Sequence, residues 1–154
     1  MTEELLSNGM DMKLCQMAVD AMARAYVPYS HHRVGAALLS EDGRIYTGCN
    51  IENAAYGPTV CAERTAVFKA VSEGTLHFSA IAVAGGRDGH VEGAFPPCGV
   101  CRQVLREFCS LDMPVLIVSC TSPLRYERFT LGELLPRSFG PENLAESLTK
   151  GDLP

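Results

Sequence analysis

Apolar residues recur at helical spacing near the start of the chain. They occupy the i, i+3, i+4 and i+7 positions of one helix face, at Leu14, Met17, Ala18, Ala21, Met22 and Ala25. The extended backbone that is favoured before Pro28 ends this stripe. The pattern therefore predicts an amphipathic helix, which follows a frayed start over about residues 1–8.

A β-hairpin is predicted directly after this helix. Two strand-like segments, 34–39 and 44–50, are joined by Ser40-Glu41-Asp42-Gly43, whose Asp-Gly pair supplies the positive φ angles of a tight turn. Later elements are expected, in chain order, as a helix at 61–72 that ends at Gly74, a buried strand at 78–84, a glycine-rich loop at 85–93, a helix at 98–109, a buried strand at 115–119, a strand at 126–130 and a short helix after Leu131.

This order of helices and strands predicts an α/β fold. Amphipathic helices cover the two faces of a sheet, so we expect a three-layer α/β/α sandwich with a mixed five-stranded sheet. The 154 residues are about the size of one common domain, and no repeat or linker divides them. We therefore expect a single domain over residues 1–154, with a tail at about 147–154.

Composition narrows the classes of function. The chain is 47% hydrophobic and 20% charged, as globular proteins are, and its net charge of -5 does not favour binding to nucleic acid or to an anionic membrane. Its longest apolar runs, 80–84 and 115–118, are far shorter than the roughly 20 residues of a membrane span. The acidic start Met1-Thr2-Glu3-Glu4 lacks the features of a secretory signal. We expect a cytoplasmic protein.

Seven cysteines, an odd number, fit a reducing compartment in which thiols serve as core residues, nucleophiles or metal ligands. Cys98 and Cys101 lie three residues apart at the start of a predicted helix, so both sulfurs can face one ion. Such a pair alone also fits a redox motif or half of a structural zinc site.

Cys61 and Glu63 add a third thiol and a carboxylate, which together fit a catalytic zinc site. A third thiolate would leave one position of a tetrahedral zinc open, as in catalytic zinc sites. Cys61 and Glu63 are two residues apart, so Cys61 should lie at the first helical turn with Glu63 beside the metal, where a carboxylate can shuttle protons. Two alternatives remain open: Cys49, Cys109, Cys120 or a histidine could close a structural site, and Glu63 could be an acid favoured by the helix dipole.

Cys61-Ala62-Glu63 together with Pro97-Cys98-Gly99-Val100-Cys101 is the three-cysteine form of the zinc-deaminase signature. The chain resembles the small homotetrameric cytidine deaminases over nearly its whole length. The matching segments are Tyr26-Val27-Pro28-Tyr29-Ser30, Val34-Gly35-Ala36-Ala37-Leu38, Gly48-Cys49-Asn50-Ile51-Glu52-Asn53-Ala54, Cys61-Ala62-Glu63-Arg64-Thr65-Ala66 and Ser138-Phe139-Gly140-Pro141.

The resemblance implies a hydrolase of pyrimidine salvage that converts cytidine and deoxycytidine to uridine and deoxyuridine with release of ammonia. It implies one Zn²⁺ per subunit, held by Cys61, Cys98 and Cys101, with Glu63 as the proton shuttle. It also implies a homo-oligomer, a tetramer with shared active sites. The substrate-binding residues implied are Asn50 and Glu52 on the ribose hydroxyls, Ala62, and Ala54, Tyr56 and Phe139 from neighbouring subunits, with Phe139 on the base.

Two arginines adjoin the cysteines and could offset the net charge of -1 that three thiolates leave on a bound Zn²⁺. The resemblance assigns Arg64 a hydrogen bond to a thiolate. Arg102 directly follows Cys101, and we expect the same of it from its position alone.

His32 departs from the family pattern. The cytidine deaminases usually carry a phenylalanine here, which stacks on the base, and an imidazole can stack in the same way. Blasticidin-S deaminases also have a histidine here, but they lack the Asn50 and Phe139 features. A nucleoside therefore remains the expected substrate. A modified cytosine nucleoside or a blasticidin-S-like antibiotic is the enzymatic alternative, and a zinc-stabilised binding module is the non-enzymatic one.

Overall fold

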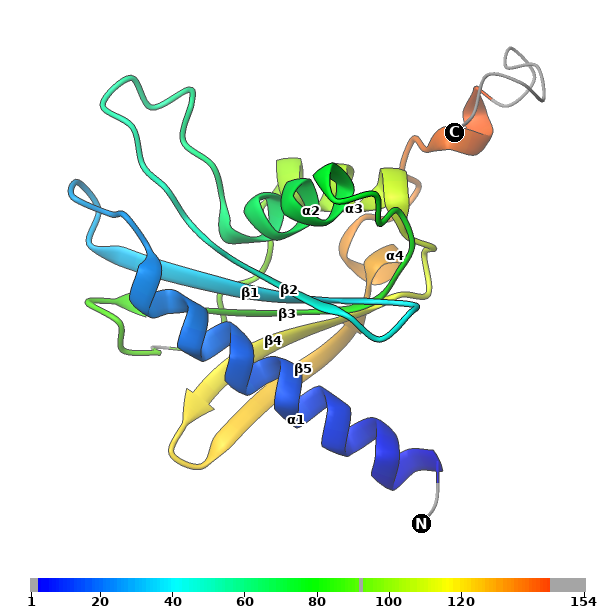
Figure 1. Cartoon of the computed structure of the whole chain (residues 1–154), viewed down its shortest axis with the longest axis horizontal. Helices are drawn as coiled ribbons and strands as arrows, with labels where there is room; N and C mark the ends of the chain where they lie inside the picture. The colour runs from blue at the N-terminus through cyan, green and yellow to red at the C-terminus, as the bar shows by residue number, and fades with distance from the viewer. Residues whose placement is uncertain (1–2, 92, 145–154) are drawn as a thin grey trace.

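The computed structural model describes residues 3–91 and 93–144 (Figure 1). In chain order the elements are α1 (Glu3–Ala21), the 3₁₀ turn η1 (Met22–Arg24), β1 (His32–Ser40), β2 (Ile45–Cys49), α2 (Ala62–Ser72), β3 (Phe78–Arg87), α3 (Gly99–Phe108), β4 (Pro114–Thr121), β5 (Leu124–Thr130), α4 (Leu131–Leu134) and the 3₁₀ turn η2 (Pro141–Asn143). The predicted order of elements is confirmed.

The five strands form one mixed sheet in the order β2-β1-β3-β4-β5. β1 runs antiparallel to both β2 and β3, β3 and β4 are parallel, and β4 and β5 are antiparallel. The parallel pair requires a crossover, which α3 provides between β3 and β4.

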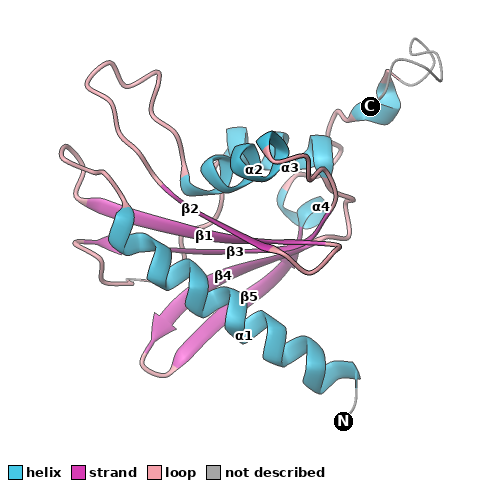
Figure 2. Ribbon diagram, in the orientation of Figure 1, coloured by secondary structure: helices cyan, strands magenta, loops and turns pink. Residues whose placement is uncertain are grey.

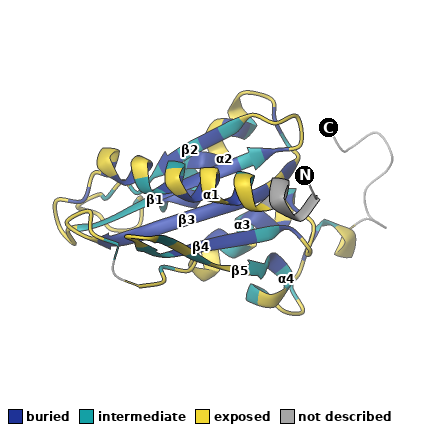
Figure 3. Ribbon diagram, turned by 90° about the horizontal axis from the view of Figure 1, so that it is seen from below, coloured by how far each residue is buried: buried dark blue, intermediate teal, exposed yellow. Residues whose placement is uncertain are grey.

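Helices cover both faces of this sheet (Figures 1 and 2). α1 crosses one face, while α2 and α3 lie on the other. The alternation of side chains along β1 serves both layers: Ala37 packs in the cluster beneath α1, and Ala36 and Leu38 pack in the cluster beneath α2 and α3. Buried residues accordingly run through the strands at the centre of the sheet (Figure 3). The predicted three-layer α/β fold is confirmed.

Several element boundaries differ from the prediction by a few residues, and two of these differences have a clear physical reason. α1 begins at Glu3, within the segment that the sequence predicts as frayed, because Glu3-Glu4-Leu5-Leu6 are good helix formers. β3 continues to Arg87 through the start of the predicted glycine-rich loop, because it pairs with the beginning of β1 as far as His32. The predicted tail at about 147–154 lies outside the described residues.

The packing of α2 on the sheet brings the functional segment into place. Gly48 of β2 meets α2 so closely that a Cβ there would lie 2.3 Å from the Ala62 carbonyl oxygen and 2.5 Å from the Ala66 nitrogen. Only glycine permits this approach at the first turns of α2. Within the described part of the chain, no helix has both the length and the apolar character that crossing a membrane requires.

Candidate metal centre and active site

Three cysteines meet where α2 and α3 begin. Cys61 and Cys98 are the N-cap residues of these helices and have extended backbones, with φ and ψ of -74° and 158° and of -67° and 166°. Cys101 lies in the first turn of α3 and is fully buried. The Cys61 and Cys98 sulfurs are 3.9 Å apart, and those of Cys98 and Cys101 are 3.5 Å apart.

This spacing suits zinc. Two sulfurs that each lie about 2.3 Å from a tetrahedral ion are about 3.8 Å apart. All three sulfurs lie within 4.8 Å of one another, and of the described residues no histidine, carboxylate or further cysteine joins the group. The donor set is therefore three thiols, and none of the candidate fourth ligands, Cys49, Cys109 and Cys120, belongs to it.

Glu63 lies beside these thiols in the first turn of α2 and is only 3% exposed. Its Oε2 atom is buried and has no hydrogen-bond partner among the described residues. Burial raises the pKa of Glu63 to about 7. A buried carboxylate oxygen without a partner is costly, and it marks a position where a bound species would complete the site.

The electrostatics of the group favour ionised sulfur at Cys61. A hydrogen bond from the Cys101 thiol, with further hydrogen bonds from Arg64 and Cys98, lowers the pKa of Cys61 to about 5 although burial opposes the shift. Arg64 Nη2 lies 3.5 Å from Cys61 Sγ, which is the contact expected of this arginine. The pKa of Cys101 is raised, first by its hydrogen bond to Cys61.

Arg102 takes a different position from the one expected. Its Nε donates to the Pro97 carbonyl at 2.7 Å, and its Nη1 donates to the Leu134 carbonyl at 2.6 Å. These two bonds tie the segment before Cys98 to the end of α4. Among the described residues Arg102 therefore supports Cys98 and Cys101 by holding the backbone beside them. Its hydrogen-bond acceptors are two carbonyl oxygens, and not the thiolate that was predicted.

A cavity of about 190 Å³ opens onto the thiols. It brings together five of the residues predicted from the sequence: Asn50, Glu52, Cys61, Glu63 and Cys98. The described residues that complete its wall are Val34, Thr59, Val60, Val83, Phe95 and Pro96. Phe95 was not predicted, because it lies in an irregular segment where periodicity carries no signal. Its place three residues before Cys98 was the one available hint.

Two polar side chains at the cavity hold the surrounding backbone. Asn50 Oδ1 accepts from the Val34 amide at 2.8 Å, and Asn50 Nδ2 donates to the His32 carbonyl at 2.9 Å. Glu52 Oε2 accepts from the amides of Tyr29 and Ser30 at 3.0 and 3.2 Å. Hydrogen bonding, first from the Ser30 side chain, lowers the pKa of Glu52, which keeps this carboxylate ionised.

The other predicted substrate-binding residues lie apart from the wall of this cavity. Ala62 is fully buried at the start of α2. Tyr56 and Phe139 are 75% and 59% exposed, and Ala54 is exposed in the same loop as Tyr56. His32 stacks on Phe95, with ring centroids 6.1 Å apart and planes inclined by 29°.

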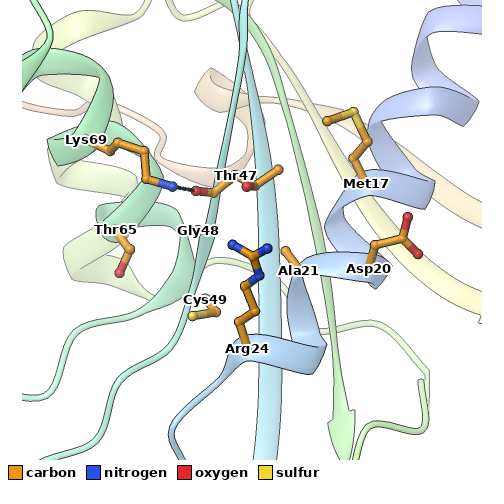
Figure 4. Close-up of a pocket in the computed structure, with 9 residues that line it drawn as sticks. All are labelled: Met17, Asp20, Ala21, Arg24, Thr47, Gly48, Cys49, Thr65 and Lys69. Carbon is orange, nitrogen blue, oxygen red and sulfur yellow. Dashed lines mark hydrogen bonds between the residues drawn. The ribbon is translucent and has the colours of Figure 1, made fainter.

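A second pocket, of about 310 Å³, lies between α1, β2 and α2 (Figure 4). Arg24 points into it from η1, and Lys69 of α2 donates to the Thr47 carbonyl. Apart from Cys49, which the sequence left open as a fourth metal ligand, none of the residues that line it was predicted for the site. The thiols and the buried carboxylate place the chemistry in the smaller cavity.

A three-thiol zinc centre with a buried acid beside it, on a sheet covered by helices on both faces, defines the class of zinc-dependent hydrolytic enzymes. Residues 9–117 match the family of the cytidine and deoxycytidylate deaminase zinc-binding region, and the chain belongs to this family. The chain is 51% identical to the cytidine deaminase of Sporosarcina psychrophila over 133 residues. This match covers 86% of this chain and 93% of that protein.

Further relatives agree in sequence and in structure. The chain is 45% identical over 127 residues to the cytidine deaminase of Mycobacterium tuberculosis, over 82% of this chain and 87% of that one. The crystal structure of cytidine deaminase from Burkholderia pseudomallei superposes with a TM-score of 0.75 at 39% identity and covers 90% of this chain and all of that one. The zinc-binding assignment of Cys61, Cys98 and Cys101 is thus confirmed.

Proposed function

We propose that this chain is a cytidine deaminase, which hydrolyses cytidine and deoxycytidine to uridine and deoxyuridine and releases ammonia in pyrimidine salvage. The single observation that carries this proposal is the buried, unpartnered Oε2 of Glu63 beside the three thiols, inside a cavity that also contains Asn50 and Glu52. Cys61, Cys98 and Cys101 hold the zinc. When bound, zinc acts as a Lewis acid that makes water nucleophilic at neutral pH.

Glu63 moves the protons of this reaction. It accepts a proton from the attacking water and delivers it to N3 of the cytosine ring as the new bond to C4 forms. It then carries the remaining hydroxyl proton to the amine, which leaves as ammonia. Cytidine and water are thus converted to uridine and ammonia with all atoms accounted for, and the Glu63 carboxylate returns to its starting state.

Asn50 and Glu52 are proposed to bind the ribose hydroxyls. Their carboxylate and amide oxygens already accept backbone amides, so both side chains are held in fixed orientations at the cavity. An acceptor oxygen has two lone pairs, which leaves capacity for a hydroxyl donor. A free nucleoside is the proposed substrate, because the net charge of -5 offers little attraction for a phosphate backbone.

We further propose a homotetramer with shared active sites. The aromatic side chains of Tyr56 and Phe139 are largely exposed in the single chain, where they bury little apolar surface. A neighbouring copy would cover both, and Phe139 would then reach the base in that copy's cavity. Light scattering measures the oligomeric state directly. The cytoplasmic location stays a prediction.

The substitution Glu63→Gln tests the proposed function. It keeps the size of the side chain but removes the proton-carrying group, so we expect zinc content and fold to persist while turnover of cytidine falls roughly 10²- to 10⁴-fold. The matched control is Glu107→Gln on the exposed side of α3, which should leave turnover unchanged. The absorbance change from cytidine to uridine measures the rate.

Near-normal turnover by Glu63→Gln would contradict the role of Glu63. If the zinc-loaded wild-type oligomer does not turn over cytidine, the substrate assignment fails. Deamination of cytosine in single-stranded DNA at a rate similar to that of cytidine would refute the proposal of a free nucleoside.

A further inference from the structure

We propose that Phe95 provides the surface on which the substrate base stacks, and that His32 holds Phe95 in place from behind. This inference rests on the proposed function and names the residue that selects a flat heterocycle. Phe95 is the one aromatic residue among the described residues that line the cavity, which it shares with Glu63 and Cys61. His32 is not among those residues.

The Phe95 ring is fixed by the sheet below it. A Cβ added at Gly85 would lie 2.7 Å from both Cγ and Cδ1 of Phe95, so the ring occupies the space that a side chain at this β3 position would take. Pro96 and Pro97 follow directly and restrict the backbone that carries the ring. A half-buried aromatic ring over a glycine in a strand is thus locked against the sheet at the cavity wall.

His32 supports the same ring from the neighbouring strand. Its imidazole stacks on Phe95 at a centroid distance of 6.1 Å with a tilt of 29°. The imidazole is itself held, because Nδ1 lies 2.9 Å from the Ser30 carbonyl, and the His32 amide donates to Ser30 Oγ at 3.1 Å. His32 is therefore a positioning residue, which acts on the substrate through Phe95.

A planar wall beside the thiols matches the shape of a pyrimidine. Val34 and Val83 add apolar surface to the same cavity, while Glu63 and Asn50 supply the polar groups that orient a ligand. Stacking on an aromatic ring stabilises a bound base and tolerates substituents at the base edge. Phe95 thus supplies a stacking ring in a chain that carries His32 where the family usually has phenylalanine.

The kinetic test compares Phe95→Leu with wild-type enzyme. Loss of the aromatic face should raise KM for cytidine roughly 10- to 100-fold, because base stacking contributes on that scale. kcat should stay within about threefold and zinc content should be unchanged, because the thiols and Glu63 are untouched. Since wild-type turnover of cytidine is measured in the same series, failure of the proposed function is distinguishable from failure of this inference.

His32 is tested by its coupling to Phe95. His32→Ala should raise KM in the same direction as Phe95→Leu, His32→Phe should restore it, and the double variant should be no worse than Phe95→Leu alone. Additive effects in the double variant would place His32 on the base itself and overturn the inference. A normal KM in Phe95→Leu would overturn it as well.

A spectroscopic test reports on stacking directly. The sequence has no tryptophan, so Phe95→Trp introduces a single tryptophan, at the cavity, whose emission can be excited apart from that of the five tyrosines. In the Glu63→Gln background, where turnover is suppressed, cytidine should quench this fluorescence in a saturable manner. Phe68→Trp, at a 49% exposed position of α2, is the matched control and should show no saturable change. Equal responses of the two tryptophans would overturn the inference.

Discussion

Replacing Gly48 by alanine should disturb the metal centre by displacing the first turns of α2. Gly48 lies in β2 opposite Ala36 of β1, and its backbone contacts the first turns of α2. Figure 4 shows it beside Thr65 of that helix. A methyl group at this position has no space, because the Ala62 carbonyl and the Ala66 nitrogen would lie 2.3 and 2.5 Å from its carbon.

The size of the disturbance follows from these distances. Heavy atoms in contact prefer a separation of about 3.5 Å, so α2 and β2 must separate by roughly 1 Å. Overpacking of this kind costs about 1–3 kcal/mol, which for a chain of this length lowers Tm by about 2 to 12 °C. Cys61 and Glu63 move with the helix, and a displacement of about 1 Å at reacting groups lowers activity roughly 10²-fold.

The assay combines thermal unfolding, zinc content and kcat/KM for cytidine. Gly9→Ala is the matched control, because Gly9 lies at an exposed position of α1 with open space around its Cα. That substitution should stabilise the protein by about 0.5–1 kcal/mol and leave kcat/KM unchanged. If Gly48→Ala keeps both the Tm and the kcat/KM of the wild type, the close approach of α2 is not what positions the site.

Two further substitutions probe the metal and the C-terminal segment. Cys61→Ala should release zinc and abolish turnover, whereas Glu63→Gln keeps the metal, so elemental analysis separates a ligand from the proton shuttle; retained stoichiometric zinc would contradict the ligand role. The Arg106 side chain is 8% exposed, donates to Ser138 Oγ at 3.0 Å and pairs with Glu142. Arg106→Leu should therefore destabilise the protein by about 1–3 kcal/mol and, by displacing the neighbouring Phe139, raise KM without changing zinc content. Thermal unfolding and steady-state kinetics test this, and an unaltered KM would contradict a contact between Phe139 and the substrate.

The helices and strands were predictable because their signals are local. A continuous apolar run predicted β3 and β4, and helical spacing predicted α2 and α3. The prediction was wrong where a distant segment changed a local preference. Gly85 and Gly86 are typical of a loop, yet they lie in β3, because β1 pairs with them and the Phe95 ring takes the space above Gly85.

The candidate site divides in the same way. The sequence by itself determined that Cys98 and Cys101 can share one helix face, because residues three apart meet on any helix. The sequence by itself also indicated Cys61 and Glu63 beside that pair, and the resemblance to a family favoured a catalytic over a structural zinc site. Only the tertiary structure decided that Arg102 binds carbonyls and that His32 lies against Phe95, 63 positions along the chain. Such contacts depend on how strands and helices pack, and no spacing within one segment encodes that packing.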